Sequence, residues 1–237
     1  MDNHIVITSF NKQRPPYDKD KAAKLYEGSP SWMDERIILF KKYYISSFLN
    51  QSDSDHHNFI MCDTSTPKKY REEFTDLEKN YPFLNFIYNK EPNSDKKTLS
   101  LIIDQYKKKR KNNSDTILTS RVDNDDMVGK QYNQEVKENL KSREWITFSE
   151  GLCINHFDHS VITYLRFHKS PFVSRKTNIN NPETPYGWVN HDVPSDSIYT
   201  NPPIWAQVIH GSNLDNKLRG PRIKLSSTFM KNNFNLA

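Results

Sequence analysis

Apolar side chains near the start of the chain first form a short run and then return at helical spacing. Residues 5–8 are β-branched and are followed by polar residues and the pair Pro15 and Pro16, which is typical of a buried strand that ends in a loop. Positions 37, 40, 44 and 48 are apolar with a helical period. Ser31 and Asp34 precede them in the order of a capping box. We predict a strand at residues 5–8 and a helix over 32–50.

The alternation of strand and helix then repeats. The apolar run 58–62 ends at Asp63, and Thr66 and Pro67 stand where an N-cap and a first-turn proline are expected. Helical spacing at positions 70, 74, 77 and 81 is followed by strand-like residues 83–88. A second helical face at 99, 102, 103 and 106 precedes strand-like residues 116–119. Strands that alternate with helices predict an α/β fold with a mostly parallel central sheet flanked by helices.

The second half of the chain is less regular. Helical spacing returns at positions 132, 136 and 140, and shorter strands are expected at residues 145–148, 152–155 and 161–167. Residues 178–200 are polar and rich in proline, which predicts a loop. The Lys- and Asn-rich stretches 18–30 and 107–114 are predicted to be surface loops as well.

Composition indicates a folded chain and leaves its ligand open. Hydrophobic residues make up 35% and aromatic residues 12%, too many for a disordered chain. No apolar run is long enough for a membrane span and the start lacks a signal-peptide pattern, so a cytoplasmic location is expected. Cys62 and Cys153 lie in apolar runs and are expected to be buried thiols. The net charge of +5 suits a polyanion or a phosphorylated small molecule.

The strongest chemical signal is the acidic cluster formed by Asp123, Asn124, Asp125 and Asp126. It follows the strand-like residues 116–120, where a parallel sheet delivers side chains into its ligand crevice. Carboxylates this close repel one another unless a cation neutralises them. Mg²⁺ and Mn²⁺ are bound in this way, through one or two carboxylates plus substrate phosphates. The alternative is a solvated turn that starts a helix, since Asp is also favoured there.

An EF-hand calcium loop does not fit the same residues. With Asp123 in the first position, Met127 stands where Asp or Asn is required. Val128 occupies the glycine position, and Gln134 the position of the bidentate glutamate. Calcium sensing is therefore not favoured.

Residues 118–126, with the sequence LTSRVDNDD, resemble the metal motif of the putative rhamnosyltransferase family, a group of small GT-A glycosyltransferases. Other similar stretches follow in the same order along residues 5–222: Trp32 with Arg36, Phe40 and Gln51; Asp63 with Thr66 and Pro67; and residues 205–213, WAQVIHGSN. The resemblance implies one domain with the GT-A (nucleotide-diphospho-sugar transferase) fold. It also implies a nucleotide-sugar donor carrying rhamnose or another hexose, a saccharide acceptor, and Mn²⁺ or Mg²⁺. Residues 1–129 would form the nucleotide-sugar-binding half and 130–237 the acceptor-side half.

The resemblance also suggests which residues contact the nucleotide-sugar. Asp125 is expected to face the ribose, and Asp123 to hold the turn or a metal-bound water. Arg121 alternates to the same strand face as Asp123, so it would meet a phosphate or form a structural pair with that carboxylate. Asn11 and Arg14, in the loop after the first strand, are further candidates for nucleotide contact.

Three residues are candidate metal ligands: Asp125, Asp126 and His210. GT-A enzymes often take a further ligand from a histidine near the C-terminus, and His210 ends an apolar run just before Gly211. A purely structural histidine is the alternative.

Two residues are candidates for the base that an inverting transfer needs, Asp192 and Glu150. Asp192 lies in the loop-like stretch 178–200 and Glu150 follows a predicted strand, and for each a surface carboxylate without a role is the alternative.

Other function classes stay open at this point. A nucleotidyltransferase or a nucleotide-sugar hydrolase would need the same metal-bound diphosphate, and a basic module that binds glycan or nucleic acid would need no catalysis. The basic run 107–111 suits the end of a helix, where cations are favourable. Nucleic acid is not favoured, because no aromatic residues interleave with these charges.

Overall fold

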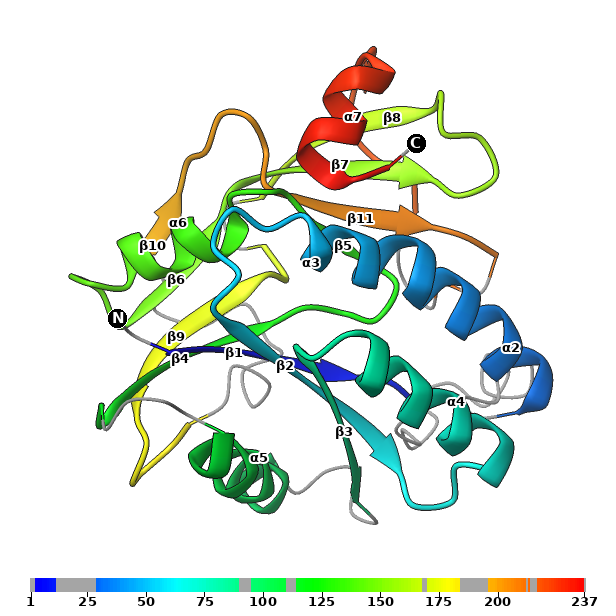
Figure 1. The fold of residues 1–237 in the computed structure, drawn as a ribbon. Coiled ribbons are helices and arrows are strands. Elements are labelled where there is room, and N and C mark those ends of the chain that lie inside the picture. The colour runs from blue at the N-terminus through cyan, green and yellow to red at the C-terminus, as the bar shows by residue number, and fades with distance from the viewer. Residues whose placement is uncertain are drawn as a thin grey trace.

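The protein has a mixed α/β fold with two sheets (Figure 1). The computed structural model describes residues 3–11, 29–89, 95–109, 114–167, 170–183, 196–211, 213 and 217–236. The first sheet has seven strands in the order β10-β6-β9-β4-β1-β2-β3. These strands are β1 (Asn3–Ser9), β2 (His56–Asp63), β3 (Leu84–Asn89), β4 (Thr116–Arg121), β6 (Trp145–Phe148), β9 (Val173–Asn178) and β10 (Asp196–Ile198).

The second sheet has five strands in the order β12-β8-β7-β11-β5. They are β5 (Met127–Val128), β7 (Glu150–Asn155), β8 (Ile162–Arg166), β11 (Trp205–Ile209) and β12 (Arg222–Ile223). Its central pair, β7 and β11, is parallel, and its other pairs are antiparallel.

The strand order of the first sheet creates a switch point next to β1. The chain adds β2 and β3 on one side of β1 and β4 on the other, as in doubly wound sheets that bind ligands at the strands' carboxyl ends. Within this sheet β9 is antiparallel to both β4 and β6, and the other pairs are parallel. The strands β1, β4, β6 and β10 therefore all end at one edge, which we call the carboxyl edge. The predicted mostly parallel α/β sheet is confirmed.

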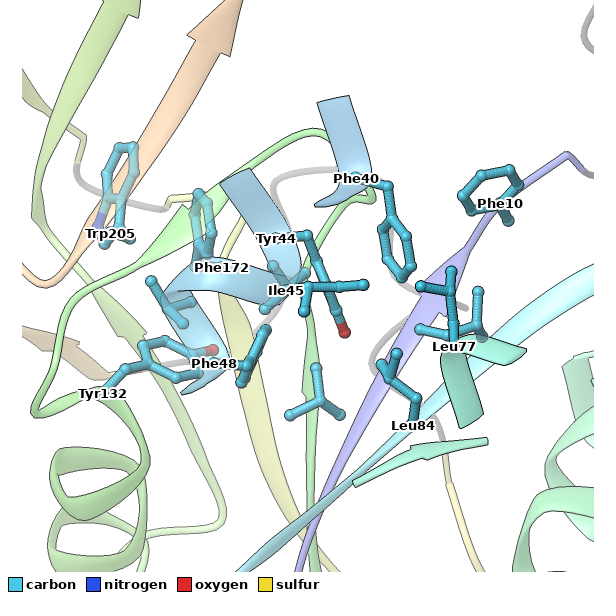
Figure 2. Packing of buried hydrophobic residues seen from close by; sticks show 14 of the residues in the cluster. Phe10, Phe40, Tyr44, Ile45, Phe48, Leu77, Leu84, Tyr132, Phe172 and Trp205 are labelled. Atoms are coloured by element: carbon cyan, nitrogen blue, oxygen red, sulfur yellow. The ribbon is translucent and has the colours of Figure 1, made fainter. Parts of the chain in front are cut away.

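Alternating side chains of β1 face two apolar cores. Val6 belongs to the larger cluster, which includes residues of the first two predicted helices, and Ile5 and Ile7 belong to a second cluster with the buried face of α5. The helical segments are α2 (Pro30–Leu39), the π-helix η1 (Phe40–Ile45), α3 (Ser46–Leu49), α4 (Lys68–Asn80), α5 (Asp95–Lys109), α6 (Tyr132–Asn139) and α7 (Ser227–Phe234). Figure 2 shows Phe40 and Tyr44 of η1 and Phe48 of α3 within the larger core. Among the described residues, no helix has the length and apolar character needed to cross a membrane.

Both predicted helix starts were displaced. Ser29, not Ser31, caps α2, since its side chain accepts from the Trp32 N–H and Pro30 begins the helix. A proline is suited to that first position because its fixed φ is already helical. At α4 the N-cap is Pro67 and has no side-chain cap, while the Thr66 hydroxyl donates to the Asp63 carbonyl at 2.6 Å.

The loop predicted over 178–200 was wrong at its end, where β10 joins the sheet beside β6. The strands β5, β9, β11 and β12 and the helix α7 were not predicted. Residues 18–28, 110–113 and 184–195 lie outside the described residues, while Lys107 to Lys109 end α5 as expected for helix-terminal cations.

Candidate active site

The acidic cluster lies at the switch point because Asn124 ties it to the end of β1. The Asn124 side-chain amide donates to the carbonyls of Ser9 at 2.7 Å and Phe10 at 3.1 Å. The turn itself is closed by the Asp126 N–H, which donates to the Asp123 carbonyl at 3.2 Å. These contacts place the ends of β1 and β4 side by side at the carboxyl edge.

Asp125 meets two nitrogen-bearing side chains through one oxygen. Its Oδ2 lies 2.5 Å from Arg36 Nη1 and 2.8 Å from His210 Nε2. The side chains of Arg36 and Asp125 are 8% and 13% exposed, so this ion pair is largely shielded from water. Burial raises the pKa of Asp125, but the charge of Arg36 and the hydrogen bond with His210 outweigh it and lower the pKa to about 2. Asp125 is therefore ionised at neutral pH.

Arg36 is fixed from several sides. Its Nη1 also donates to Asn124 Oδ1 at 3.1 Å, and its guanidinium lies 4.9 Å from the centre of the Trp32 ring. Arg36 thereby joins α2 to the acidic cluster. Arg36 was not predicted as a site residue, although its position on the buried, apolar face of a predicted helix was a signal that it pairs with a buried anion.

Asp126 contacts β11. Its Oδ1 accepts the Val208 N–H at 3.0 Å, and the residue is only 2% exposed. Burial and the nearby charges of Asp125 and Asp123 raise the pKa of Asp126 well above its usual range. A cation near this carboxylate would lower that electrostatic cost.

His210 lies just after β11, with a fully buried side chain. Its Nδ1 is 3.8 Å from Glu35 Oε1, and its Nε2 is 3.1 Å from Asn213 Nδ2 as well as close to Asp125. Its backbone N–H donates to Asn213 Oδ1. Glu35 and Asn213 were not predicted as site residues, since neither stands out in the sequence without the fold that brings α2 to β11.

The remaining predicted nucleotide contacts are only partly described. Arg121 Nη2 lies 3.3 Å from Asp123 Oδ1, the pairing that the sequence left open as an alternative. The Asn11 side chain donates to Thr66 Oγ1 at 2.9 Å and accepts the Asp63 N–H at 3.1 Å, so it ties together the ends of β1 and β2. Arg14 lies outside the described residues.

Of the two candidate bases, only Glu150 lies among the described residues. Asp192 lies outside the described residues. Glu150 starts β7, one residue beyond Ser149, which follows β6 at the carboxyl edge. The other end of β7 leads to His156, whose N–H donates to the Ile209 carbonyl next to His210. The structure thus brings together Asp125, Asp126, Asp123, Arg121 and His210, while Glu150 lies beyond the end of a different strand, β6, at the same edge.

The arrangement fits a divalent cation for which the protein supplies only some of the ligands. Within the described ranges, no group of three or more His, Cys, Asp and Glu side chains is arranged to hold a metal ion. Asp125 Oδ2 and His210 Nε2 nevertheless lie within hydrogen-bond distance of each other, 2.8 Å, which brings two groups able to ligate a metal to one place. Mg²⁺ and Mn²⁺ commonly take one or two protein groups and complete their coordination with water and substrate phosphates. The donor pair fits that kind of site.

Fold and site together define an α/β protein whose charged side chains gather at the switch point of a parallel sheet, where such sheets bind ligands. The chain belongs to the family described as "Putative rhamnosyl transferase", whose sequence profile matches residues 5–213. This membership supports a glycosyltransferase, in agreement with the resemblance of residues 118–126. No curated protein matches the chain in sequence.

Solved structures with some similarity are remote. TarS 1-349 from S. aureus is 9% identical with a TM-score of 0.35, over 65% of this chain and 35% of that one. The same protein in complex with UDP is 10% identical with a TM-score of 0.32, over 65% of this chain and 35% of that one. A putative nucleotide-diphospho-sugar transferase from Desulfovibrio desulfuricans G20 is 7% identical with a TM-score of 0.36, over 83% of this chain and 72% of that one. The chain thus spans about a third of TarS 1-349.

Proposed function

We propose that the chain is a GT-A glycosyltransferase that moves a hexose, rhamnose being one candidate, from a nucleotide-sugar to a saccharide acceptor. The observation that carries this proposal is the meeting of Asp125, His210 and Arg36 at the carboxyl edge, beside the switch point of the sheet. In a chain of this family, that is the expected place of the donor diphosphate.

Asp125 and His210 are the proposed protein ligands of Mn²⁺ or Mg²⁺, with Asp126 beside them as a further carboxylate. When bound, a divalent cation neutralises the negative charge that develops on the leaving nucleoside diphosphate. Arg36 keeps Asp125 ionised and oriented, since its guanidinium contacts both Asp125 and Asn124. Arg121 orients Asp123 in the same way. Asn11 and Arg14 remain proposed nucleotide contacts.

The acceptor hydroxyl must lose a proton as it attacks the sugar, and Asp192 and Glu150 remain the proposed bases for an inverting reaction. Asp192 belongs to the residues between the end of β9 and the start of β10, and both of these strand ends lie at the edge opposite the carboxyl edge.

Calorimetry with UDP, dTDP and GDP, each in Mn²⁺ and in chelator, tests the proposal. At least one nucleotide should bind in Mn²⁺ and lose most of its affinity in chelator, since the carboxylates alone repel phosphates. Binding of none of them in either condition contradicts the proposed donor. Product analysis then separates transfer, which releases a nucleoside diphosphate and forms a glycoside, from hydrolysis or nucleotidyl transfer.

A further inference from the structure

Glu150 carries a buried carboxylate oxygen that lacks a partner. Its side chain is 1% exposed, and Oε1 lies 3.2 Å from Arg166 Nε and accepts from the Ser149 hydroxyl at 3.4 Å. Within the described part of the chain, Oε2 has no hydrogen-bond partner. A buried carboxylate oxygen without a donor is costly, so its persistence indicates a ligand or water that donates to it.

Exposed side chains surround this carboxylate. Arg166 lies opposite Glu150 in the β7–β8 pair, and its side chain is 79% exposed. Ser149 donates its N–H to the Ile198 carbonyl at 2.9 Å, which brings Tyr199, 63% exposed, beside the start of β7. Tyr164 shares a face of β8 with Arg166, and burial, followed by its interaction with Glu150, raises the pKa of Tyr164 to about 12.

These groups match the chemistry of a sugar ring. A pyranose offers hydroxyl donors on its rim and C–H groups on its face. Glu150 Oε2 can accept from a hydroxyl, Arg166 can donate to a hydroxyl oxygen, and the ring of Tyr199 can cover an apolar C–H face. Charge assistance makes the contact with the carboxylate the strongest of the three.

The position fits an acceptor. Glu150 follows β6 at the same carboxyl edge as the acidic cluster, which follows β4, and β9 lies between these two strands. With neighbouring strands about 4.8 Å apart, the two strand ends are separated by about 10 Å across the sheet. That separation is on the scale of a disaccharide.

We propose that Glu150, Arg166 and Tyr199 form a saccharide subsite that holds the acceptor, with a sugar hydroxyl donating to Glu150 Oε2. The role of this subsite in holding the acceptor rests on the proposed function, whereas saccharide binding itself is testable without a donor.

Saturation-transfer NMR with a panel of methyl glycosides tests the subsite directly. The panel is methyl α-L-rhamnopyranoside, methyl α-D-mannopyranoside, methyl β-D-glucopyranoside and methyl β-D-galactopyranoside. At least one should bind the wild-type protein. Tyr199→Ala should weaken that binding about tenfold, and Tyr199→Phe should retain it within about twofold because the ring remains. Ile38→Ala is a matched control, since Ile38 on α2 is 62% exposed.

Glu150→Gln should weaken the same glycoside about tenfold, because the charge-assisted contact is lost. If that variant fails to fold, the two Tyr199 variants still decide the question. Absence of binding to the wild-type protein, or equal binding to Tyr199→Ala, overturns the subsite. Nucleotide calorimetry on the same samples keeps the two proposals apart. Glycoside binding without nucleotide binding contradicts the proposed donor alone, and the reverse result contradicts the subsite alone.

Discussion

Asp125 Oδ2 lies 2.8 Å from His210 Nε2, although 85 positions separate the two residues in the chain. Arg36, on the first described helix, reaches the same oxygen at 2.5 Å. One buried carboxylate oxygen therefore joins α2, the turn after β4 and the end of β11. Arg36 and His210 both compensate the buried charge of Asp125. The three residues should therefore behave as a unit when one of them is replaced.

Arg36→Met tests this coupling through stability. Removing the guanidinium leaves the Asp125 carboxylate buried without its cation, which should cost about 3 kcal/mol of unfolding free energy. The double variant Arg36→Met/Asp125→Asn should be less destabilised than the sum of the two single variants, because the uncompensated charge is gone. Urea denaturation of the four proteins measures the coupling.

The control for Arg36→Met is Lys69→Met. Lys69 pairs with Asp34 on the surface at 3.1 Å, with side chains 69% and 54% exposed. Its loss should leave the urea midpoint unchanged, since exposed ion pairs contribute little. Additive costs for Arg36→Met and Asp125→Asn would show that the pair is not a unit.

His210→Ala tests the proposed metal ligand. In the wild-type protein, Mn²⁺ together with a nucleoside diphosphate at about 100 times its dissociation constant should add roughly 2.7 kcal/mol and raise the melting temperature. His210→Ala should lose most of the part of this shift that depends on Mn²⁺, because a neutral imidazole nitrogen is removed from the ion. Differential scanning fluorimetry in Mn²⁺ and in chelator gives both values.

The control for His210→Ala is His159→Ala, on the neighbouring loop, where His159 Nε2 lies 2.9 Å from the Tyr43 hydroxyl. This variant should keep the full Mn²⁺-dependent shift. If His210→Ala keeps it too and is less stable in chelator, His210 is a structural residue.

Much of the fold was predictable because it rests on local periodicity. The α5 positions 99, 102, 103 and 106 are all buried, and β1, β2, β3 and β4 fall where short apolar runs predict strands. β9 was hidden because most of its buried side chains are polar. Ser174 Oγ bonds Ser120 Oγ at 2.6 Å, and Arg175 lies over the Trp145 ring at 4.2 Å. Such a strand lacks an alternation of hydrophobic and polar residues, because its buried polar side chains bind side chains of other strands.

The candidate site, like the fold, was predictable only in part from the sequence. The acidic cluster was predictable because its four residues are adjacent in sequence and follow a strand. Arg36 and Glu35 were not, because their role depends on the packing of α2 against β11. The position of Arg36 on an apolar helix face indicated a buried anionic partner, but only the fold could show that this partner is Asp125.

Two glycines should differ sharply in their tolerance of a methyl group. A Cβ on Gly151 would overlap the indole ring of Trp205, whose Nε1 is fixed by a bond to the Phe148 carbonyl at 2.8 Å. Gly151→Ala should therefore cost about 1–3 kcal/mol through overpacking. Gly211→Ala is the matched control, since its Cβ would meet only Phe157 Cζ at an ordinary 3.8 Å. Thermal unfolding of both variants checks this, and equal melting temperatures would contradict the packing around Trp205.

Two buried histidines should make stability depend on pH. Burial lowers the pKa of His56 to about 4, and burial with the charges of His56 and Lys137 lowers the pKa of His4 well below its usual value. Between pH 6.5 and 4 the unfolded chain binds more protons than the folded one at these sites, so stability falls as the pH falls. For His56 alone the loss from pH 7.5 to pH 5 should be about 2 kcal/mol.

His56→Gln isolates this contribution. The variant should lose less stability than the wild type between pH 7.5 and pH 5, by about 2 kcal/mol, whatever its stability at neutral pH. The comparison removes the opposing effect of Asp126, whose raised pKa favours the folded state as the pH falls and is common to both proteins. Lys137, Asp53 and His57, whose charges also act on His56, are unchanged in the variant. Urea denaturation at several pH values gives the two slopes, and identical slopes would mean that His56 is not held neutral in the folded protein.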